Sequence, residues 1–576
     1  MTASKWQIKQ TDANLALMAK TLGISEITSN VMANRNIRSK NTALAFLSPS
    51  IDRLGDTLQM KGAEETLARI SSAMTNREKI VIYGDYDVDG ITSTAILHKV
   101  LTRLGANCSY YIPHRMEEGY GLTLSTIEKL AEEGTELIVA VDNGISAVAE
   151  IEAANEKGIS TVIIDHHEPG GELPPAAGIV DPKQPGCPYP FKELCAAGLA
   201  YKMAEALCEY IDTPFVEQDE MLVLAAIGTL CDIVDLTDEN RSIVNCGLTI
   251  LNANKLINPG LGSLLTMRGY LDKPIDAFTI GFIVGPCINA AGRLESASLA
   301  MELLLAEDFS RRMELVYKLA ELNEERKALT TDCVERLMAE IDQQNLDKIL
   351  VLTDTQAHES IAGIAAGRIR EATNRPTIVL TSGDGAMKGS ARSIPSFDIF
   401  QALSTHRKLF QRFGGHAMAA GLTLDAENIP MLRHALNHEC NLTEDDFCPV
   451  IHIDRELSPD DVTLHLSGEL SRLAPFGKGN EEPLFASREL FAQSVRVIDD
   501  KNTLIFTFYS TTDKKIKGIA FGLNEIYAQK LREIDALDKK HGGLIMDVVY
   551  AIETNVYNGA SSVQMRVRDF VVRDKK

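Results

Sequence analysis

An acidic segment directly after a short apolar run constrains this chain more than any other feature. Residues 79–83 (KIVIY) have the apolar, β-branched character of a buried strand, and Asp85, Asp87 and Asp89 follow at alternate positions. Residues at the carboxyl end of a strand in an open α/β sheet lie where such folds bind their ligands. Carboxylates this close together repel one another unless a divalent cation lies between them, so the segment predicts a metal site.

Two alternatives stay open for this segment when it is taken alone. DYDVDG matches the start of an EF-hand calcium loop, but the last position of that loop, which requires a glutamate, is Ile96. A predicted strand also precedes the segment, where an EF-hand has a helix. The other alternative is a simple cluster of helix N-caps.

Further acids and histidines follow other apolar runs in the chain. They are Asp142 after 137–141, Asp165, His166 and His167 after 161–164, and Asp232 after 221–230. Each one alone is more typical of a turn or a helix cap. Parallel strands, however, end at one edge of a sheet, so together these side chains predict one site. An oxygen-rich set without cysteine suits Mn²⁺ or Mg²⁺, and two ions about 3.5–4 Å apart would suit displacement at phosphorus.

The pattern around this segment predicts an α/β fold. Strand-like runs alternate with helical patterns, which indicates a parallel sheet covered by helices on both faces. The predicted strands are 79–83, 108–112, 137–141 and 161–164, and the predicted helices are 91–104, 123–133 and 146–157.

The rest of the chain predicts three further parts. Residues 190–305 have mostly helical patterns, and 307–343 lacks Gly and Pro, as expected of one long helix. A second α/β unit begins with the strand-like run 348–352. After residue 446, several strands and one helix predict a small β-barrel of the OB type. Its predicted strands are 450–454, 494–498, 503–509, 516–521, 544–552 and 563–572, and its predicted helix is 524–534.

These patterns predict five parts of the chain. They are a helical lead-in at 1–75, the first α/β domain at 76–305, a connecting helix at 306–345, the second α/β domain at 346–445 and the barrel at 446–576.

Composition limits the class of protein. The chain has 58 Lys and Arg against 80 Asp and Glu, a net charge of −22, which argues against non-specific coating of nucleic acid but not against a local basic groove. Its 10 cysteines are scattered without a CxxC pair, which favours a reduced, cytoplasmic chain over a zinc or disulfide framework. Neither a signal-peptide pattern nor a long uncharged apolar stretch is present, so no membrane span is expected.

Several motifs together resemble one family. GDYDVDG, VDNG, DHH and CDIVDL are similar to the successive motifs of the DHH phosphoesterases. GSARS at 389–393 and GGHAMAAG at 414–421 resemble the DHH-associated domain (DHHA1). LAPFGKGN at 473–480 resembles the segment that leads into the OB domain of the RecJ exonucleases. The resemblance covers about residues 40–576, and by it the chain is identified as a member of the bacterial RecJ exonucleases.

This resemblance implies an activity and a set of metal ligands. It implies a DHH domain, a long helix, a DHHA1 domain and an OB-fold, which together degrade single-stranded DNA from the 5′ end with Mn²⁺ or Mg²⁺ in recombination and repair. Carried over by motif, the metal ligands are Asp85, Asp87, Asp89, Asp142, His166 and Asp232. His167 would face the scissile phosphate or assist the leaving oxygen rather than bind metal, Asp165 would orient the histidines, and Asp235 would be a structural cap.

The resemblance also implies a set of substrate-binding residues. They are Arg115, Arg293, Ser390, Arg392, His416, Gly414 and Gly415. Glycines expose backbone N–H groups to a phosphate, and Arg392 could hold its oxygens in a fork, although tight turns and a surface ion pair would explain the same residues. His358 either binds substrate or caps the helix that follows it, and the cap is the favoured interpretation. In the barrel, Phe476, Phe506, Phe508 and Tyr509 are either stacking platforms or core, and Lys478 and Arg472 are the basic candidates.

Other readings remain open. A DHH phosphodiesterase for short oligonucleotides or cyclic dinucleotides, or a DHH pyrophosphatase, would lack the extra domains or the GGHAMAAG pattern. A non-catalytic, DNA-binding scaffold should have lost several of the acids, yet all are present. Family likeness further implies a monomer that works with single-strand-binding protein and a RecQ-type helicase.

Overall fold

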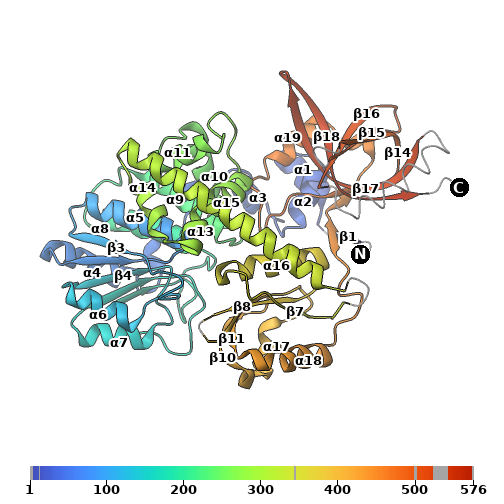
Figure 1. Ribbon diagram of the computed structural model, residues 1–576. Helices are drawn as coiled ribbons and strands as arrows, with labels where there is room; N and C mark the ends of the chain where they lie inside the picture. The colour runs from blue at the N-terminus through green and yellow to red at the C-terminus, as the bar shows by residue number, and fades with distance from the viewer. Residues whose placement is uncertain are drawn as a thin grey trace. The chain divides into compact units, whose positions relative to one another are not determined.

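The computed structural model describes residues 4–11, 13–342, 346–383, 385–498, 503–522 and 543–573. They form two compact units, and the ribbon in Figure 1 is coloured along the chain. The larger unit contains Ile51–Val234 and Glu239–Cys448, and the smaller contains Met1–Ser50, Asp235–Asp238 and Pro449–Lys576.

The first sheet of the larger unit is parallel throughout, as predicted. Its strand order is β3-β2-β4-β5-β6. The strands are β2 (Ile80–Tyr83), β3 (Cys108–Tyr111), β4 (Leu137–Val141), β5 (Ser160–Ile164) and β6 (Gly178–Val180). Helices cover both faces of the sheet (Figure 1), and these helices are α4 (Ala63–Asn76), α5 (Val88–Arg103), α6 (Leu124–Glu132), α7 (Val148–Glu156) and α8 (Ala196–Tyr210). Alternate strand residues such as Val81 and Ile138 form one apolar core with Ile127 of α6 and Ile151 of α7.

A helical part follows the sheet, which confirms the expectation for residues 190–305. Its helices are α9 (Gln218–Cys231), α10 (Asp238–Ala253), α11 (Pro259–Met267), α12 (Ala277–Thr279), a π-helical turn (Ile280–Val284), α13 (Gly285–Leu294) and α14 (Ser298–Leu305). The predicted long helix is α15 (Phe309–Glu340), which packs against α13 and against α16 (Ala362–Thr373) of the next lobe.

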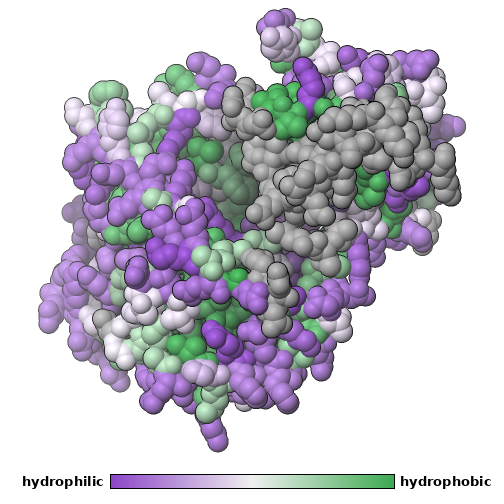
Figure 2. Space-filling model, turned by 45° about the vertical axis from the view of Figure 1, so that its right-hand side comes forward, coloured by the Kyte–Doolittle hydropathy of each residue, from purple (hydrophilic) through white to green (hydrophobic). Residues whose placement is uncertain are grey.

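One helical stretch among the described residues is long and apolar enough to cross a membrane. It is Ala277–Leu294, and half of it is buried inside the protein, as is usual for a core helix. Figure 2 shows a surface that is mostly hydrophilic on the side drawn there, with hydrophobic side chains in smaller groups. A single helix that qualifies by length and composition, and is half buried, is weak evidence for a membrane span.

The second lobe of the larger unit has a mixed sheet, ordered β10-β11-β9-β8-β7, in which only β7 and β8 run parallel. The strands are β7 (Leu350–Thr353), β8 (Thr377–Ser382), β9 (Met387–Arg392), β10 (Phe410–His416) and β11 (Ala419–Leu424). α15 and α16 pack on one face of this sheet, and α17 (Ile399–Thr405) and α18 (Ile429–Glu439) pack on the other.

The smaller unit contains the predicted barrel. Strand pairing runs β14-β15-β16-β18-β17, and β17 pairs back to β14, which closes the sheet on itself. The strands are β14 (Phe485–Ile498), β15 (Thr503–Tyr509), β16 (Lys515–Phe521), β17 (Leu544–Tyr557) and β18 (Ala560–Arg573). Phe506 and Phe508 are fully buried, so these two side chains are core. The predicted helix 524–534 lies outside the described residues.

The N-terminal segment belongs to the smaller unit. β1 (Lys5–Ile8) pairs in parallel with β12 (Val450–Ile453), and Trp6 donates a hydrogen bond to Asp569 at 2.9 Å. Apolar side chains of α1 (Leu15–Leu22), α2 (Glu26–Ala33) and α3 (Lys40–Leu47) share one core with the barrel and with α19 (Leu464–Ser471). The short strand β13 (Arg455–Glu456) pairs with the start of β14.

Candidate active site

The acidic segment leads directly from β2 into α5. Asp87 is the N-cap of α5, and its side chain accepts the backbone N–H of Gly90 at 3.1 Å. A Cβ on Gly90 would lie 2.6 Å from the Cβ of Asp85, so glycine lets the helix begin this close to the strand end. Asp85 and Asp89 are both buried.

Asp89 is held in place by the start of another helix. Its two carboxylate oxygens accept the backbone N–H groups of Ala196 at 2.8 Å and Ala197 at 2.9 Å, in the first turn of α8. The free N–H groups and positive dipole of a helix N-terminus favour a carboxylate there. A Cβ on Gly228 of α9 would lie 2.7 Å from Asp89 Oδ1, so α9 also restricts this side chain.

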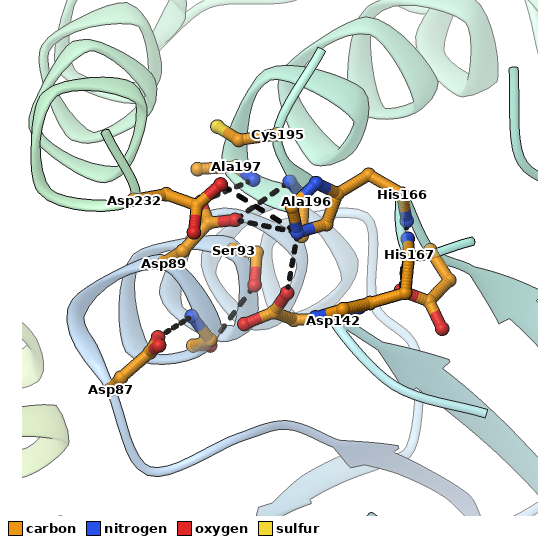
Figure 3. A network of polar contacts seen from close by, with 12 residues as sticks. Asp87, Asp89, Ser93, Asp142, His166, His167, Cys195, Ala196, Ala197 and Asp232 are labelled. Carbon is orange, nitrogen blue, oxygen red and sulfur yellow. Dashed lines mark hydrogen bonds and ion pairs between the residues drawn. The ribbon is translucent and has the colours of Figure 1, made fainter. Parts of the chain in front are cut away.

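The other predicted ligands converge on the same point (Figure 3). His166 Nε2 lies 3.2 Å from Asp142 Oδ1 and 3.7 Å from both Asp89 Oδ2 and Asp232 Oδ2. Asp142 follows β4 and Asp232 caps the C-terminus of α9. Asp142 (φ 63°) and Ile233 (φ 61°) both have left-handed backbone conformations, a strain that proteins keep mainly at functional sites.

These residues form overlapping groups that could hold metal ions. The groups, each with ligand atoms within 4.8 Å of one another, are Asp85, Asp87 and Asp142; Asp89, His166 and Asp232; and Asp142, His166 and His167. His166 Nε2 and Asp85 Oδ1 are buried and accept or donate no hydrogen bond with any residue that the structure describes. A carboxylate-rich set with one or two imidazoles suits Mn²⁺ or Mg²⁺. The structure therefore brings together all the predicted ligands in an arrangement that fits divalent cations.

The electrostatics of the pocket favour a bound cation. Burial raises the pKa values of Asp85, Asp89 and Asp142 well above the ordinary range, and repulsion between these neighbouring acids raises them further. Burial lowers the pKa of His166 to about 4. A divalent cation would compensate the carboxylate charge and displace protons from these groups.

His167 and Asp165 form a second layer beside the pocket. His167 Nδ1 lies 2.7 Å from Asp165 Oδ1, and Asp165 also accepts the backbone N–H groups of Ile145 and His166. Burial lowers the pKa of His167 but the hydrogen bond and charge of Asp165 outweigh it, so the pKa is raised to about 9. The Tyr120 hydroxyl donates to the carbonyl of Asp142 at 3.0 Å and lies 3.2 Å from His167 Nδ1.

Arginine side chains gather near the same strand edge. Arg293, at the end of α13, donates to the carbonyl of Ser360 at 2.8 Å. Burial, and then the charges of Arg115, Arg326 and Arg392, lower its pKa to about 9. The pKa of Arg392 is lowered by burial and then by Arg115 and Arg370. Partly buried guanidinium groups that repel one another favour a bound anion such as phosphate.

A cleft of about 510 Å³ lies between the loop after β3 and the second sheet. Of the predicted substrate-binding residues, Arg115, Ser390 and Gly414 line this cleft. His416 is exposed at the end of β10 and is not among the lining residues. Gly415 has φ 150°, and a Cβ there would lie 2.3 Å from the carbonyl of Ala419, so the β10–β11 hairpin itself requires this glycine.

Several residues of the site were not predicted. Tyr120, Lys388 and Arg412 line the cleft, and the first two lie within or beside segments that carry predicted residues. Ala196 and Ala197 act through backbone N–H groups, which no residue type reveals. His358 is the expected cap, because its Nδ1 accepts the backbone N–H of Ser360 at 3.3 Å.

Comparisons with known proteins agree with this architecture. Residues 79–229 match the N-terminal domain of the DHH family, residues 346–442 match the DHHA1 domain, and residues 453–569 match the RecJ OB domain. The matches follow one another in chain order, as the motifs do.

Full-length relatives extend the similarity. The chain is 36% identical to the single-stranded-DNA-specific exonuclease RecJ of Bacillus subtilis, over 100% of this chain and 72% of that protein. It is 32% identical to RecJ of Dickeya dadantii, over 93% and 94% of the two chains. The crystal structure of Thermus thermophilus RecJ in complex with Mn²⁺ matches with a TM-score of 0.82 and 27% identity, over 99% of this chain and 80% of that one. Similarity of this extent, together with the three domain matches, shows that the chain belongs to the RecJ family of single-stranded-DNA-specific exonucleases.

Proposed function

We propose that this chain is a metal-dependent exonuclease that degrades single-stranded DNA in the 5′→3′ direction to mononucleotides, in DNA recombination and repair. One observation carries this proposal: carboxylates and imidazoles from three strand ends and the end of α9 converge beside a cleft that contains arginines. Metal ligands next to phosphate binders are the arrangement that hydrolysis of a phosphodiester requires.

Two divalent cations, Mn²⁺ or Mg²⁺, would be held by Asp85, Asp87, Asp89, Asp142, His166 and Asp232. When bound, such ions supply an activated water and neutralise the charge that develops on the phosphate. The chain's own contribution is to fix the ligands: Asp89 by the N–H groups of α8, and His166 by the end of β5.

The arginines and the second lobe would bind the strand. Arg115, Arg293 and Arg392 would pair with phosphate oxygens, and Ser390 would donate a hydrogen bond to one of them. Gly414 would let the backbone approach the phosphate closely. A narrow cleft between the two lobes would admit one strand and exclude a duplex, so we infer selectivity for single-stranded DNA.

His167 would hold a proton near the scissile phosphate. Asp165 keeps Nδ1 of His167 engaged, and Nε2 lies 3.4 Å from the hydroxyl of Tyr120, a residue that lines the cleft. A protonated His167 would then stabilise charge on a phosphate or leaving oxygen.

The remaining parts of the proposal concern organisation and cellular setting. We infer a DHH domain at 76–305, a DHHA1 domain at 346–445 and an OB domain at 446–576 that binds DNA, with 1–75 and 306–345 as the lead-in and connecting helix. Family likeness supports single-strand-binding protein and a RecQ-type helicase as partners, and a monomer as the working form. All 10 cysteines are free thiols, which supports a reducing, cytoplasmic setting.

The test uses a single-stranded oligonucleotide labelled separately at each end, with Mn²⁺, Mg²⁺ or a chelator. We expect early release of mononucleotide from the 5′ label, and no release with chelator or with Asp142→Ala. Asp332→Ala, an exposed acid on α15, is the matched control and should cleave like wild type.

Other outcomes assign other functions. Early loss of the 3′ label would contradict the polarity, and turnover of dinucleotides without cleavage of long strands would favour a small-substrate phosphodiesterase. Binding of single-stranded DNA without turnover of any substrate would favour a scaffold.

A further inference from the structure

Two phenylalanine rings stack in solvent on the helix that borders the metal centre. Phe278 and Phe282 are 58% and 67% exposed, and their ring centroids lie 4.8 Å apart at an interplanar angle of 21°. Phe278 belongs to α12, and Phe282 lies in the π-helical turn that continues into α13. Turns of the π type are concentrated at functional sites, and exposed apolar patches mark binding surfaces.

The helix that carries this pair touches the metal centre at two glycines. A Cβ on Gly285 would lie 2.6 Å from the Sγ of Cys231, the residue before Asp232. A Cβ on Gly292 would lie 2.7 Å from the carbonyl oxygen of Tyr86, between Asp85 and Asp87. The helix therefore packs directly against the two segments that supply these acids.

Three features lie in order along this helix. Phe282 and Phe278 lie about 4.5 Å and about 10 Å before Gly285 along the axis, and Arg293 lies about 12 Å after it. The aromatic pair and the arginine are thus at opposite ends, with the metal-binding acids between them. Ile233, directly after Asp232, is 66% exposed and adds apolar surface beside the metal centre.

We infer that Phe278 and Phe282 form a stacking surface for bases of the strand that still awaits cleavage. This inference rests on the proposed function, because it takes the terminal phosphate to lie at the Arg293 end. Every base has a flat π-face, so aromatic stacking holds a strand without selecting its sequence. We assign a single-stranded nucleic acid to this aromatic surface because the surface is continuous with the metal centre.

Stacking leaves a signature that phosphate contacts do not. Removing a phosphate contact makes binding less sensitive to salt, whereas removing a stacking ring weakens binding equally at all salt concentrations. The two phenylalanines carry no charge, so their loss should leave the salt slope unchanged.

The experiment measures binding of a fluorescein-labelled oligonucleotide at several salt concentrations, with Ca²⁺ in place of the catalytic ion. We expect Phe278→Ala/Phe282→Ala to bind about tenfold more weakly than wild type at each concentration. Phe282→Leu keeps apolar area without a π-face and should also bind weakly, whereas Phe282→Trp should retain affinity. Thermal unfolding of each variant shows that it is folded.

A matched control and a positional test sharpen the result. Tyr210→Ala removes a ring that is 49% exposed at the far end of α8. It lies about 21 Å along that helix from Ala196, and it should bind like wild type. Abasic sites moved one nucleotide at a time from the 5′ end should weaken wild-type binding at one or two positions, and this sensitivity should be absent from the double variant.

Three results would overturn the inference. Equal affinity of wild type and the double variant would exclude stacking here. Full recovery with Phe282→Leu would show that apolar area alone matters, as for a protein partner. A wild-type mass in solution that rises with concentration, and that Phe278→Ala/Phe282→Ala reduces, would assign the surface to a second copy of the chain. Cleavage of the end-labelled oligonucleotide by wild type tests the proposed function separately, so the two failures are distinguishable.

Discussion

His167 Nδ1 lies 2.7 Å from Oδ1 of Asp165, and the Asp165 side chain is completely buried. The same carboxylate accepts backbone N–H groups from Ile145 and His166, so its oxygens are already engaged within the protein. Asp165 is therefore suited to orient His167 and to keep it charged, in the way that carboxylates beside metal-site histidines commonly act.

Replacing Asp165 by asparagine should change how stability depends on pH. The folded pKa of His167 is raised from 6.5 to about 9, so the pair stabilises the fold fully below about pH 6.5, and this is lost as pH rises through about 9. Asp165→Asn removes that contribution. The difference in unfolding temperature between wild type and Asp165→Asn, measured in chelator, should therefore be larger at pH 6 than above pH 9, where only the backbone hydrogen bonds of Asp165 still distinguish the two proteins.

A surface pair provides the control for this measurement. His406 lies 3.1 Å from Glu439, whose side chain is 57% exposed, so Glu439→Gln should shift the curve little. Curves for wild type and Asp165→Asn that run parallel from pH 6 to pH 10 would contradict the assigned role of Asp165.

Replacing Asp142 by asparagine should abolish the response to metal. Mn²⁺ at a hundred times its dissociation constant should stabilise wild type by about 2.7 kcal/mol, and Asp142→Asn should lose most of this gain. Without metal, the variant should unfold at a higher temperature than wild type, because the buried acids no longer repel a third charge. Asparagine tolerates the left-handed backbone at this position.

The metal response should also depend on pH. Because the pKa values of Asp85, Asp89 and Asp142 are raised, protons compete with the cation, and the gain in unfolding temperature should shrink as pH falls. Scanning calorimetry with Mn²⁺ and with chelator checks both the loss of the metal response in Asp142→Asn and the dependence of that response on pH. An equal response to Mn²⁺ in Asp142→Asn would remove this residue from the ligand set.

Arg293 should bind phosphate, and its repulsion of the neighbouring arginines should lower the stability of the protein without phosphate. Inorganic phosphate should raise the unfolding temperature of wild type, and Arg293→Gln should show little of this effect, because repulsion among arginines is what the anion relieves. In Arg293→Gln, the slope of log affinity for an oligonucleotide against log salt concentration should be less steep than in wild type by about 0.7. Arg103→Gln, at an exposed pair with Glu217, should behave like wild type in the phosphate measurement.

Adding one methyl group at Gly228 should damage the metal centre. The new Cβ would lie 2.5 Å from the Cβ of Ala197 and 2.7 Å from Asp89 Oδ1, so α9 must shift, at about 1–3 kcal/mol. Gly367→Ala is the matched control, since Gly367 also lies within a helix and has nothing within 4 Å of its Cβ position. That variant should gain about 0.5–1 kcal/mol. Denaturant unfolding and Mn²⁺ titration of both variants give the comparison, and unchanged Mn²⁺ affinity in Gly228→Ala would contradict the strained contact.

Local sequence patterns predicted much of the site. Asp85, Asp142 and His166 each follow an apolar run of strand length, and strand ends of a parallel sheet meet at one edge, so their convergence could be predicted without a structure. The barrel as a class was predictable in the same way, from several strand-like runs in the last part of the chain, although β14, β17 and β18 are 14 residues long and the closing pair β14–β17 is a long-range contact. These inferences succeeded because they depend on periodicity within a few residues.

Contacts between distant segments were decided only by the tertiary structure. The N–H groups of Ala196 and Ala197 reach Asp89, more than a hundred positions earlier in the chain, through backbone atoms that every residue has. The pairing of β1 with β12 joins segments more than 400 positions apart in the chain, Lys5 with Val450, and no local pattern indicates it. The mutual proximity of Arg293 and Arg392 depends on how α13 packs against the second lobe. The sequence by itself thus determined which chemical groups lie at strand ends. Long-range packing determined which of these groups are buried, how they are oriented, and which of them repel one another.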